Sequence, residues 1–536
     1  MSILSIKEFN LFIREKLILN NISLDLNKGE VLGIAGESGS GKSMMALSIL
    51  NLLPSNSRKN GFIYFENKCI SNFSDKEMCK IRGKDISLIF QEPLTALNPL
   101  KTIKEQVAEP LLIHRNYSKK KSLDIATQYL EKVELPKNLT KDEIYPHEIS
   151  GGQQQRVLIA KSLVLKPKII IADEPTTSLD VITQKGILDL LKILVNKLGI
   201  SLLLITHDLA VLAQCADRVA IMKSGEILET GNLENIFKNK KHPYTKKLLN
   251  AVNYSPKKKD KSSKKVILSV NAVSTSYHNS KSLFFKNQNK LKILNNLSFK
   301  MFEGEILGVI GESGSGKSTI VKTILGLQHC ETGEILINNR KIEARKFKDR
   351  KIRSMMQVVF QDPYGSFNPK HRIRKLISEP FFILDNVLTK REIEERVSLA
   401  LEEVGLSPSD SNKFIHEFSG GQRQRIAIAR ALITKPKLII LDEAVSSLDV
   451  SIKAQILDLL AELADKHTLT YLFISHDLSV VKNIANRVIV IRRGEIVEEG
   501  KAKHILSNPK KRYTKSLVEA IPVIPKNILN GGQIAK

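Results

Sequence analysis

The sequence predicts an α/β protein of two tandem units, each with a mixed, mainly parallel sheet core and an inserted helical subdomain. Two observations predict this class. Landmark residues recur in one order at a nearly constant offset, since Lys42 and Lys317 differ by 275 positions and Asp173 and Asp442 by 269. In addition, short apolar runs that end in glycine or in polar residues alternate with helical stretches, as parallel strands covered by helices do. The repetition indicates an internal duplication.

Composition places the chain among folded proteins without a membrane span. It has 536 residues, of which 42% are hydrophobic and 26% charged. No apolar run approaches the roughly 18 residues that a spanning helix needs. The start, MSILSIKEFN, lacks the pattern of a secretory signal, so we expect a cytoplasmic chain. The net charge of +27 fits either a diffuse bias toward lysine or a surface that works near a membrane or a polyanion.

The four cysteines are not spaced as metal ligands, and reduced structural thiols are expected. They are Cys69, Cys79, Cys215 and Cys330. The stretch SPKKKDKSSKK, at 255–265, is polar and has no apolar periodicity, which predicts a solvated linker; a structured connector is the alternative. The predicted units are therefore residues 1–254 and 266–536, each ending in a short tail.

Each unit opens its sheet with a buried strand. EVLGIAG at 30–36 and EILGVIG at 305–311 are apolar runs that end in glycine, and a helical stretch follows each one. KIIIADE at 168–174 and LLLITHD at 202–208 are further strands that end in polar residues, and both recur in the second unit. Ligands of such sheets bind at the carboxyl ends of the strands, where these polar residues fall.

Two other segments complete each unit. A hairpin is expected at 218–231 and again at 487–500, with turns at Ser224-Gly225 and Arg493-Gly494. Residues 101–147 and 370–416 are predicted to form helices with charged faces, which we interpret as the inserted subdomains.

GESGSGKS follows the first strand of each unit and opens a helix, which is specific for a phosphate-binding loop. Glycines let backbone N–H groups approach phosphate oxygens, the lysine adds a mobile positive charge, and the final serine is placed to ligate Mg²⁺. The sequence therefore predicts that both loops bind a nucleoside triphosphate. The loop residues are Gly36, Glu37, Ser38, Gly39, Ser40, Gly41, Lys42 and Ser43, and Gly311, Glu312, Ser313, Gly314, Ser315, Gly316, Lys317 and Ser318.

Paired carboxylates end the next predicted strand in each unit. Asp173 and Asp442 can hold Mg²⁺, and Glu174 and Glu443 come directly after them. Because side chains alternate along a strand, one carboxylate is expected to face the metal while the next orients or deprotonates the attacking water.

Histidine and glutamine complete the predicted catalytic set. His207 and His476 end apolar strands and can contact the γ-phosphate and hold the water. Gln91 and Gln361 lie in LIFQEP and VVFQDP, and their amide oxygens can ligate Mg²⁺.

Two further segments bring in a family resemblance that covers nearly the whole chain. ISGGQQQR and FSGGQRQR look like the signature motif of ABC ATPases. In each half the order of phosphate loop, Gln loop, signature, Asp-Glu strand, SLD loop and His loop matches that family. The signature residues are Ser150, Gly151, Gly152 and Gln153, and Ser419, Gly420, Gly421 and Gln422.

The resemblance implies that the two units pair head to tail. ATP then lies between one unit's phosphate loop and the other unit's signature, so that Lys42 works with Ser419 and Lys317 with Ser150. The signature offers exposed N–H groups at a helix start, a second anion site for the γ-phosphate. Both sites keep all these residues, which predicts two hydrolytic sites with Mg²⁺ as cofactor.

Two positions depart from the two-fold pattern. The family stacks adenine on an aromatic residue upstream of the phosphate loop; Tyr277 fits that place in the second half, and either Phe12 or Ile13 fits it in the first. DEPTTSLD of the first half is DEAVSSLD in the second, which leaves the carboxylates intact.

Local features resemble the ATP-binding subunits of peptide and nickel importers of the oligopeptide, dipeptide and microcin C type. These are EPLTALNP, DPYGSFNP, and the tails HPYTKKLL and KRYTKSL. The resemblance implies two integral-membrane permease subunits and a substrate-binding protein as partners, with this chain peripheral on the inner membrane and no nucleic acid bound. The alternative is a tandem ABC ATPase that acts on ribosomes or nucleic acid. The carried solute is left open, with dipeptides, longer peptides, microcin C-like peptides, glutathione and nickel as candidates.

Overall fold

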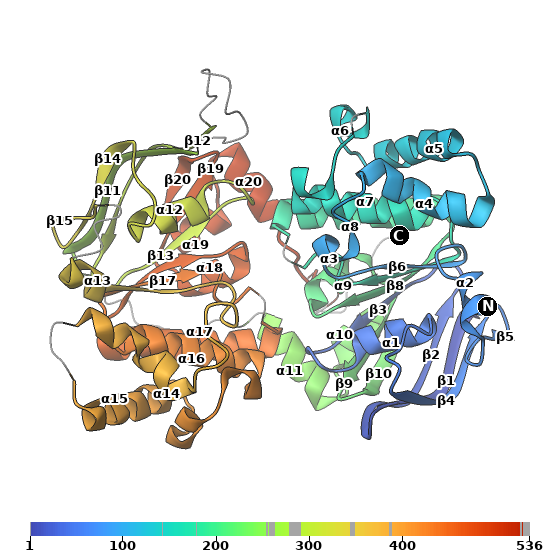
Figure 1. Ribbon diagram of the computed structural model, residues 1–536, viewed down its shortest axis with the longest axis horizontal. Helices are drawn as coiled ribbons and strands as arrows, with labels where there is room; N and C mark the ends of the chain where they lie inside the picture. The colour runs from blue at the N-terminus through green and yellow to red at the C-terminus, as the bar shows by residue number, and fades with distance from the viewer. Residues whose placement is uncertain are drawn as a thin grey trace.

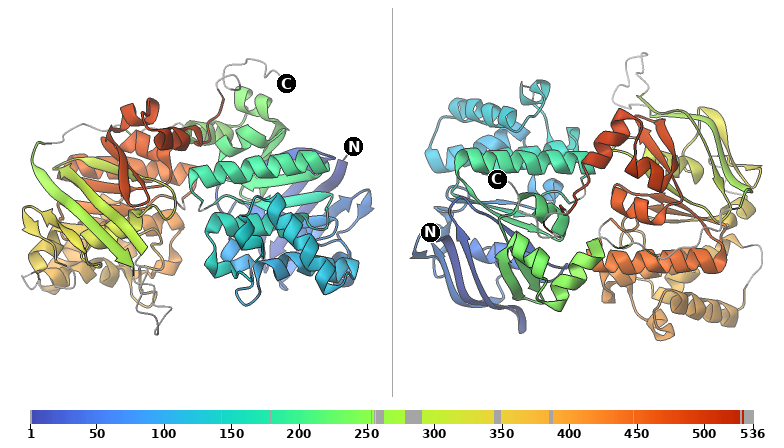
Figure 2. Two further views of the ribbon diagram at one scale, coloured as in Figure 1. Left: turned by 90° about the horizontal axis from the view of Figure 1, so that it is seen from above. Right: turned by 180° about the vertical axis from the view of Figure 1, so that it is seen from behind.

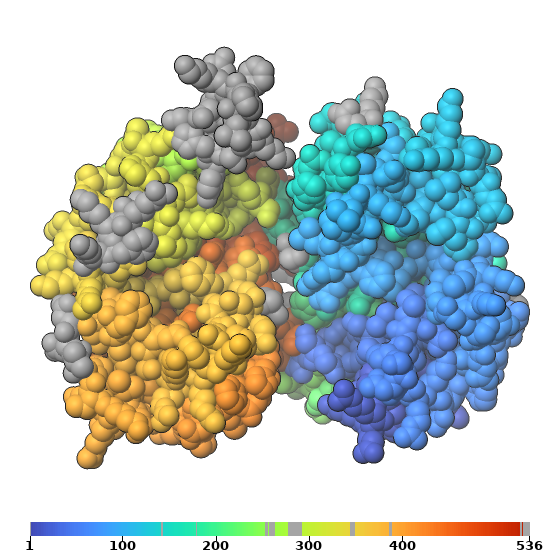
Figure 3. Space-filling view, in the orientation of Figure 1, coloured from blue at the N-terminus to red at the C-terminus, as the bar shows by residue number. Residues whose placement is uncertain are grey.

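The chain forms two halves with the same order of layers, which lie side by side in the computed structural model (Figure 1). The structure describes residues 2–141, 143–177, 179–252, 254, 256, 263–277, 291–343, 349–384, 388–446, 448–525 and 528. Most of the predicted linker at 255–265 therefore lies outside the described residues. Figure 3 shows the seam between the halves as a narrow hollow on this face of the molecule.

Each half has an antiparallel sheet and a mixed one. The antiparallel sheets have the order β2-β1-β4-β5 and β12-β11-β14-β15. Their strands are β1 (Ser2–Ile13), β2 (Lys16–Asn27), β4 (Ser57–Phe65), β5 (Lys68–Cys69), β11 (Val266–Tyr277), β12 (Leu291–Phe302), β14 (Thr332–Ile337) and β15 (Arg340–Lys341).

The six-stranded sheets have the order β10-β9-β3-β8-β7-β6 and β16-β17-β18-β13-β19-β20. Within each, only the last pair in sequence is antiparallel, which confirms the predicted mainly parallel core and the predicted hairpins. The strands are β3 (Val31–Ala35), β6 (Ile86–Ile89), β7 (Ile169–Asp173), β8 (Ser201–Thr206), β9 (Arg218–Lys223), β10 (Glu226–Asn232), β13 (Ile306–Ile310), β16 (Met356–Val359), β17 (Leu438–Asp442), β18 (Thr470–Ile474), β19 (Arg487–Arg492) and β20 (Glu495–Lys501).

Helices α4 to α6 of the first half lie in the region predicted as a helical subdomain, and α14 and α15 do so in the second, with short 3-10 turns. The helices of the first half are α1 (Lys42–Ile49), α2 (Asp75–Cys79), α3 (Pro93–Ala96), α4 (Ile103–Arg115), α5 (Lys119–Lys132), α6 (Lys137–Lys141), α7 (Gly151–Leu163), α8 (Val181–Leu198), α9 (Leu209–Cys215), α10 (Leu233–Asn239) and α11 (Pro243–Val252). Those of the second half are α12 (Lys317–Ile324), α13 (Arg350–Met355), α14 (Ile373–Ser378), α15 (Lys390–Glu403), α16 (Gly420–Leu432), α17 (Val450–His467), α18 (Leu478–Ile484), α19 (Ala502–Ser507) and α20 (Arg512–Glu519).

The central strands are apolar because both of their faces are buried. In β7, Ile169 and Ile171 pack toward the antiparallel sheet, whereas Ile170 and Ala172 pack toward the helices. Strands buried on both faces read as continuous apolar runs, which is why they could be found in the sequence. The polar residue that ends each strand thus lies at the edge of a rigid sheet.

The two halves also share core packing. Val181, at the start of α8, belongs to the second half's core, and Ile528 belongs to the first half's. Figure 2 shows α11 of the first half against α17 of the second, and α20 of the second half against α8 of the first. The C-terminal tail of each half therefore packs against the other half. Among the described residues, no helix has the length and apolar character needed to cross a membrane.

Candidate functional site

The phosphate loops are tight turns between a buried strand and a short helix. The Lys42 ammonium donates hydrogen bonds to the carbonyls of Gly36 and Glu37 at 2.8 Å each. Burial lowers the pKa of Lys42, while nearby carboxylates, Glu174 foremost, oppose that effect. Lys317 repeats the arrangement with bonds of 2.7 and 2.8 Å to its own loop. Each loop thus curls around a buried lysine.

Glycine is required in these loops for two different reasons. A Cβ on Gly36 would lie 2.2 Å from the Met222 carbonyl oxygen, so only glycine lets the loop lie on β9. Gly41, at the start of α1, has φ 98°, which L-residues rarely adopt. Both features keep the backbone N–H groups of the loop and of the helix start open toward a phosphate, as a nucleotide site needs.

The residues at the end of β7 fit a hard divalent cation. The Ser43 hydroxyl hydrogen-bonds to Asp173, and the other Asp173 oxygen, Oδ1, is buried with no hydrogen-bond partner. Burial raises the pKa of Asp173. In the second half, burial and then the charge of Glu443 raise the pKa of Asp442 to about 6. Carboxylate and hydroxyl oxygens are the donors that Mg²⁺ prefers.

The raised pKa of Asp442 makes a stability prediction. The pKa of Asp442 is about 6 in the folded protein and 3.8 ordinarily. The charged carboxylate therefore lowers the free energy of unfolding, and this loss is absent below pH 3.8 and complete above pH 6. Asp442→Asn should therefore stabilise the nucleotide-free protein at pH 7.5 by about 1–3 kcal/mol, measured by thermal unfolding without Mg²⁺.

The matched control is Asp124→Asn, at an exposed position of α5. It should leave the unfolding midpoint unchanged, and added Mg²⁺-ATP should raise the midpoint of Asp124→Asn more than that of Asp442→Asn. A destabilised Asp442→Asn protein would contradict the assignment of a buried carboxylate whose charge costs stability.

Glutamate and histidine form a buried pair in each half. Nδ1 of His207 lies 3.1 Å from Glu174 Oε2, and Nδ1 of His476 lies 3.1 Å from Glu443 Oε2. Burial by itself raises the pKa of Glu174, but the hydrogen bond and charge of His207 outweigh burial and hold it below its ordinary value. The pairing in turn raises the pKa of His207, although burial works in the opposite direction. Each glutamate is therefore kept ionised, as a general base must be.

The geometry behind Glu174 differs from the predicted one. β7 ends at Asp173, and Glu174 follows it with φ 45°, so left-handed backbone and not strand alternation separates the two carboxylates. Glu443 has φ 51°. Non-glycine residues in this region cost about 1–3 kcal/mol, and such strain concentrates at functional sites. The turn directs Glu174 toward His207.

Gln91 hydrogen-bonds to the glutamate of the first Glu-His pair, whereas Gln361 does not do so in the second pair among the described residues. Gln91 Nε2 donates to Glu174 Oε2 at 3.1 Å. Gln361 makes no hydrogen bond to Glu443 in the part of the chain that the structure describes. The Gln91 bond uses the amide nitrogen, so its oxygen, the atom predicted to ligate Mg²⁺, is not engaged by Glu174.

The signature segments cap helices. Ser150 and Ser419 are the N-caps of α7 and α16, and each accepts a hydrogen bond at 3.4 Å from the amide of Gln153 or Gln422. A Cβ on Gly152 would meet Thr183 at 2.3 Å, so glycine lets α7 approach the helix after the SLD loop. Among the described residues, no hydrogen bond joins a signature to the opposite phosphate loop.

The SLD loops make hydrogen bonds that cross between the halves and reach the phosphate loops. Asp449 accepts hydrogen bonds from the Ser38 amide at 2.8 Å and the Ser38 hydroxyl at 2.9 Å. Reciprocally, Asp180 accepts from the Ser313 amide at 3.3 Å. Each phosphate loop is thus contacted by an aspartate of the other half. The serines of both SLD loops, Ser178 and Ser447, lie outside the described residues.

Sequence reasoning left four supporting residues out of the site. Besides Asp180 and Asp449, Tyr244 and Tyr513 belong to it, because their hydroxyls accept hydrogen bonds from the phosphate-loop amides of Glu37 and Glu312. Their bonds measure 3.2 and 3.0 Å. Both pairs recur 269 positions apart, in the SLD loops and the tails, so repetition was the signal that could have found them.

The strand register settles which first-half residue matches Tyr277. Tyr277 is the last residue of β11 and pairs with Leu291, while Ile13 is the last residue of β1 and pairs with Lys16. Ile13, and not Phe12, therefore occupies the corresponding position. The Tyr277 side chain lies outside what the structure describes.

Comparison with known proteins decides the family. The profile described as "ABC transporter" matches residues 19–177 and 294–446. The chain belongs to the ABC transporter family. It is an ATP-binding, ATP-hydrolysing subunit with two ABC ATPase domains. A second profile, "Oligopeptide/dipeptide transporter, C-terminal region", matches residues 228–275 and 497–535, which include both tails.

Relatives of this ABC transporter subunit match along most of their length. The peptidoglycan transport ATP-binding protein YejF of Agrobacterium fabrum is 43% identical over 94% of this chain and 92% of its own. The glutathione import ATP-binding protein GsiA of Salmonella paratyphi A is 40% identical over 94% of this chain and 86% of its own. The solved structure of cbiO1 from Clostridium perfringens, part of the ABC transporter complex cbiONQ, is 28% identical with a TM-score of 0.40, over 46% of this chain and 92% of its own. The two transport relatives, YejF and GsiA, do not favour action on ribosomes or nucleic acid.

Proposed function

We propose that this ABC transporter subunit holds two composite ATP sites, one at each phosphate loop, and drives uptake of peptides or related small solutes. The reciprocal contacts of Asp449 and Asp180 with the opposite phosphate loops carry this proposal, because each site then includes groups from both halves. The units are residues 1–254 and 266–536, joined by the linker at 255–265.

In each proposed site, different residues bind the phosphates, activate the water and position the base. Lys42 and Lys317 bind phosphate oxygens of ATP, and the opposite signature serine and glycines grip the γ-phosphate when the halves close. Glu174 or Glu443 accepts the proton of the attacking water as its oxygen bonds to the γ-phosphorus and the bond to ADP breaks. The paired histidine holds that glutamate ionised and in place.

Mg²⁺ fits the oxygen donors at each strand end. Ser43, Gln91 and Asp173 would hold it in the first site, and Ser318, Gln361 and Asp442 in the second. When bound there it neutralises charge on the β- and γ-phosphates.

Transport requires separate membrane subunits, and the regions after the two glutamine loops offer a surface for them. Leu94 and Tyr364, from these regions, are 68% and 44% exposed. Phe90 and Leu100 near Leu94, and Phe360 near Tyr364, are exposed as well, and a group of exposed apolar side chains is typical of a protein interface. Together with the tail profile and the transport relatives, this surface supports docking to two permease subunits at the inner membrane, with a substrate-binding protein delivering the solute.

A double variant tests the docking. Leu94→Asp with Tyr364→Asp should reduce recovery of integral-membrane proteins with the tagged chain by at least about tenfold, because two buried charges would oppose contact. The purified chain should still bind ATP. The control is Phe62→Asp on β4, since Phe62 is 50% exposed but lies on the antiparallel sheet, away from both glutamine loops. Stable association with ribosomes and with no membrane protein would overturn the proposed function.

A further inference from the structure

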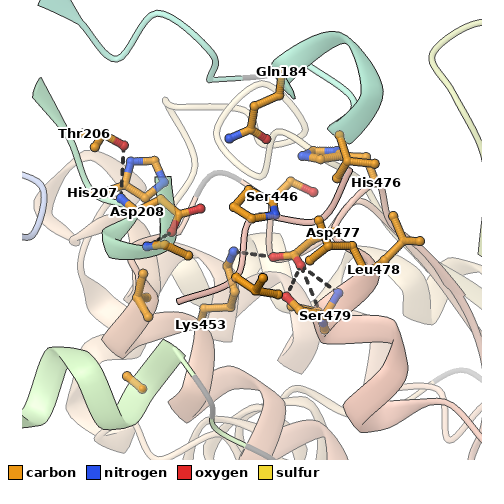
Figure 4. Close-up of a pocket in the computed structure, with 18 of the residues that line it drawn as sticks. Gln184, Thr206, His207, Asp208, Ser446, Lys453, His476, Asp477, Leu478 and Ser479 are labelled. Atoms are coloured by element: carbon orange, nitrogen blue, oxygen red, sulfur yellow. Dashed lines mark hydrogen bonds and ion pairs between the residues drawn. The ribbon is translucent and has the colours of Figure 1, made fainter. Parts of the chain in front are cut away.

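The loops that follow the two catalytic histidines meet between the halves. Asp208 comes after His207, Asp477 comes after His476, and both aspartates line a cavity of about 600 Å³. Figure 4 shows the Lys453 ammonium between the two carboxylates. Of the described residues that line this cavity, Lys453 is the one lysine or arginine. One cation therefore serves two acidic groups that come from different halves.

Lys453 is anchored in its own half. It lies in the first turn of α17, and its Nζ is 2.9 Å from Asp477 Oδ2, with the two side chains only 17% and 24% exposed. Burial alone lowers the pKa of Lys453, but Asp477 and then Asp208 raise it above its ordinary value, so the ammonium remains charged. From this fixed position its charge acts across the interface on Asp208 and His207.

The internal repeat breaks at the two positions that support these aspartates. The residue 269 positions before Lys453 is Gln184, and the residue 269 positions before Ser479 is Ala210. The first half therefore has neither the lysine nor the serine at positions where the second half has both.

The consequence is unequal support for the two carboxylates. Asp477 accepts hydrogen bonds from the Ser479 amide at 3.1 Å, the Val480 amide at 3.3 Å and the Ser479 hydroxyl, besides its ion pair with Lys453. Among the residues that the structure describes, the donor to the Asp208 carboxylate is the Ala210 amide, at 2.8 Å. Within its own half Asp208 has this bond and the charge of His207, and the lysine charge comes to it from the other half, whereas Asp477 has both its lysine and its serine within its own half.

This dependence reaches the first ATP site through His207. His207 is adjacent to Asp208 in the chain and bonds to Glu174. Without Lys453, the buried Asp208 carboxyl would face Asp477 with no intervening cation, and burial already raises the pKa of Asp208. The carboxyl would then either take up a proton or move away from Asp477, and either change alters the surroundings of His207, its neighbour in the chain.

We propose that Lys453 is a positioning residue for the first ATP site, supplied in trans by the second half, and that the second site has no counterpart. The inference rests on the proposed function of Glu174 and His207. It makes the first site competent only when the halves are closed, because closure brings Lys453 against Asp208. The second site lacks this requirement, since Gln184 is uncharged.

The experiment is vanadate trapping of radioactive 8-azido-ATP on the full chain, followed by photolabelling and assignment of the label to peptides of each half. Label in the first half reports nucleotide on the Lys42 loop. In Lys453→Gln the ratio of first-half to second-half label should fall about fivefold. Lys453→Arg should keep the wild-type ratio, because it keeps the charge.

Two rescue variants separate positioning from a general structural role. Adding Ala210→Ser to Lys453→Gln supplies the hydroxyl that Asp208 lacks, and adding Gln184→Lys returns a cation to the cavity from the first half. Both double variants should restore first-half label toward the wild-type level. The double variant of Lys453→Gln with Gln184→Lys also conserves the net charge of the cavity, so it can be tested even if Lys453→Gln alone folds poorly.

Three results would overturn the inference: an unchanged ratio in Lys453→Gln, a parallel loss of label in both halves, or rescue by neither second change. Failure of the proposed function is distinguishable, because the wild-type chain would then trap nucleotide in neither half.

Discussion

Replacing Glu443 by Gln should lower steady-state ATP turnover by about 100-fold or more, and Glu174→Gln should do the same. Glutamine keeps the size of the side chain and can still hydrogen-bond to the histidine 3.1 Å away, but it cannot accept the proton of the attacking water. Because both sites keep a complete set of residues, loss at either one should remove coupled turnover. Phosphate release from the purified chain measures the effect.

Two controls accompany this measurement. Glu395→Gln, on the exposed face of α15, removes a carboxylate whose partner among the described residues is Arg391 on the surface, and turnover should not change. ATP binding should persist in Glu443→Gln, since the phosphate loop and its lysine are untouched. Full turnover in Glu174→Gln or Glu443→Gln would sink the assignment of that glutamate as the base.

The second large effect is expected from Lys42→Ala, which should impair ATP-driven uptake even though Lys317 is intact. A hydrogen bond from a charged donor is worth about 1.5–3 kcal/mol, which corresponds to about 10- to 100-fold in ATP affinity at that site. The loss also leaves the loop carbonyls of Gly36 and Glu37 without their donor. Uptake of a radiolabelled tripeptide into vesicles containing the co-purified membrane subunits measures the result.

The matched control is Lys28→Ala, which removes an exposed lysine of the first half outside the loop and should leave uptake unchanged. Uptake at the wild-type rate in Lys42→Ala would mean that the second site alone can drive transport, and the requirement for two sites would be wrong. Nucleotide binding at Lys317 should be retained in either case.

The fold was predictable because its signals are local and occur twice. A strand buried on both faces must be apolar, and a loop that wraps phosphate must contain glycine, so β3 and GESGSGKS could be recognised without coordinates. The same holds for the mainly parallel sheet, the hairpins and the helical insertions, which the structure confirms.

The site was predictable only in part. The type of a residue does not fix its backbone conformation. The sequence therefore predicted strand alternation at Glu174 and not the left-handed φ of 45° that the structure has. Nor could the sequence choose between Phe12 and Ile13, because the choice depends on the register of β1 and β11, which are followed by connections of different length.

The sequence by itself determined the duplication and the family, and it predicted the chemistry of each half-site, because these depend on which residues recur at fixed spacing. The tertiary structure decided which distant groups meet: Tyr244 lies on the Glu37 amide within the first half, whereas Asp449 on the Ser38 amide and Lys453 between Asp208 and Asp477 cross the interface. The physical reason is that hydrogen bonds and ion pairs act over a few ångströms, so they follow proximity in space, and residues more than 200 positions apart become neighbours only when the chain has folded.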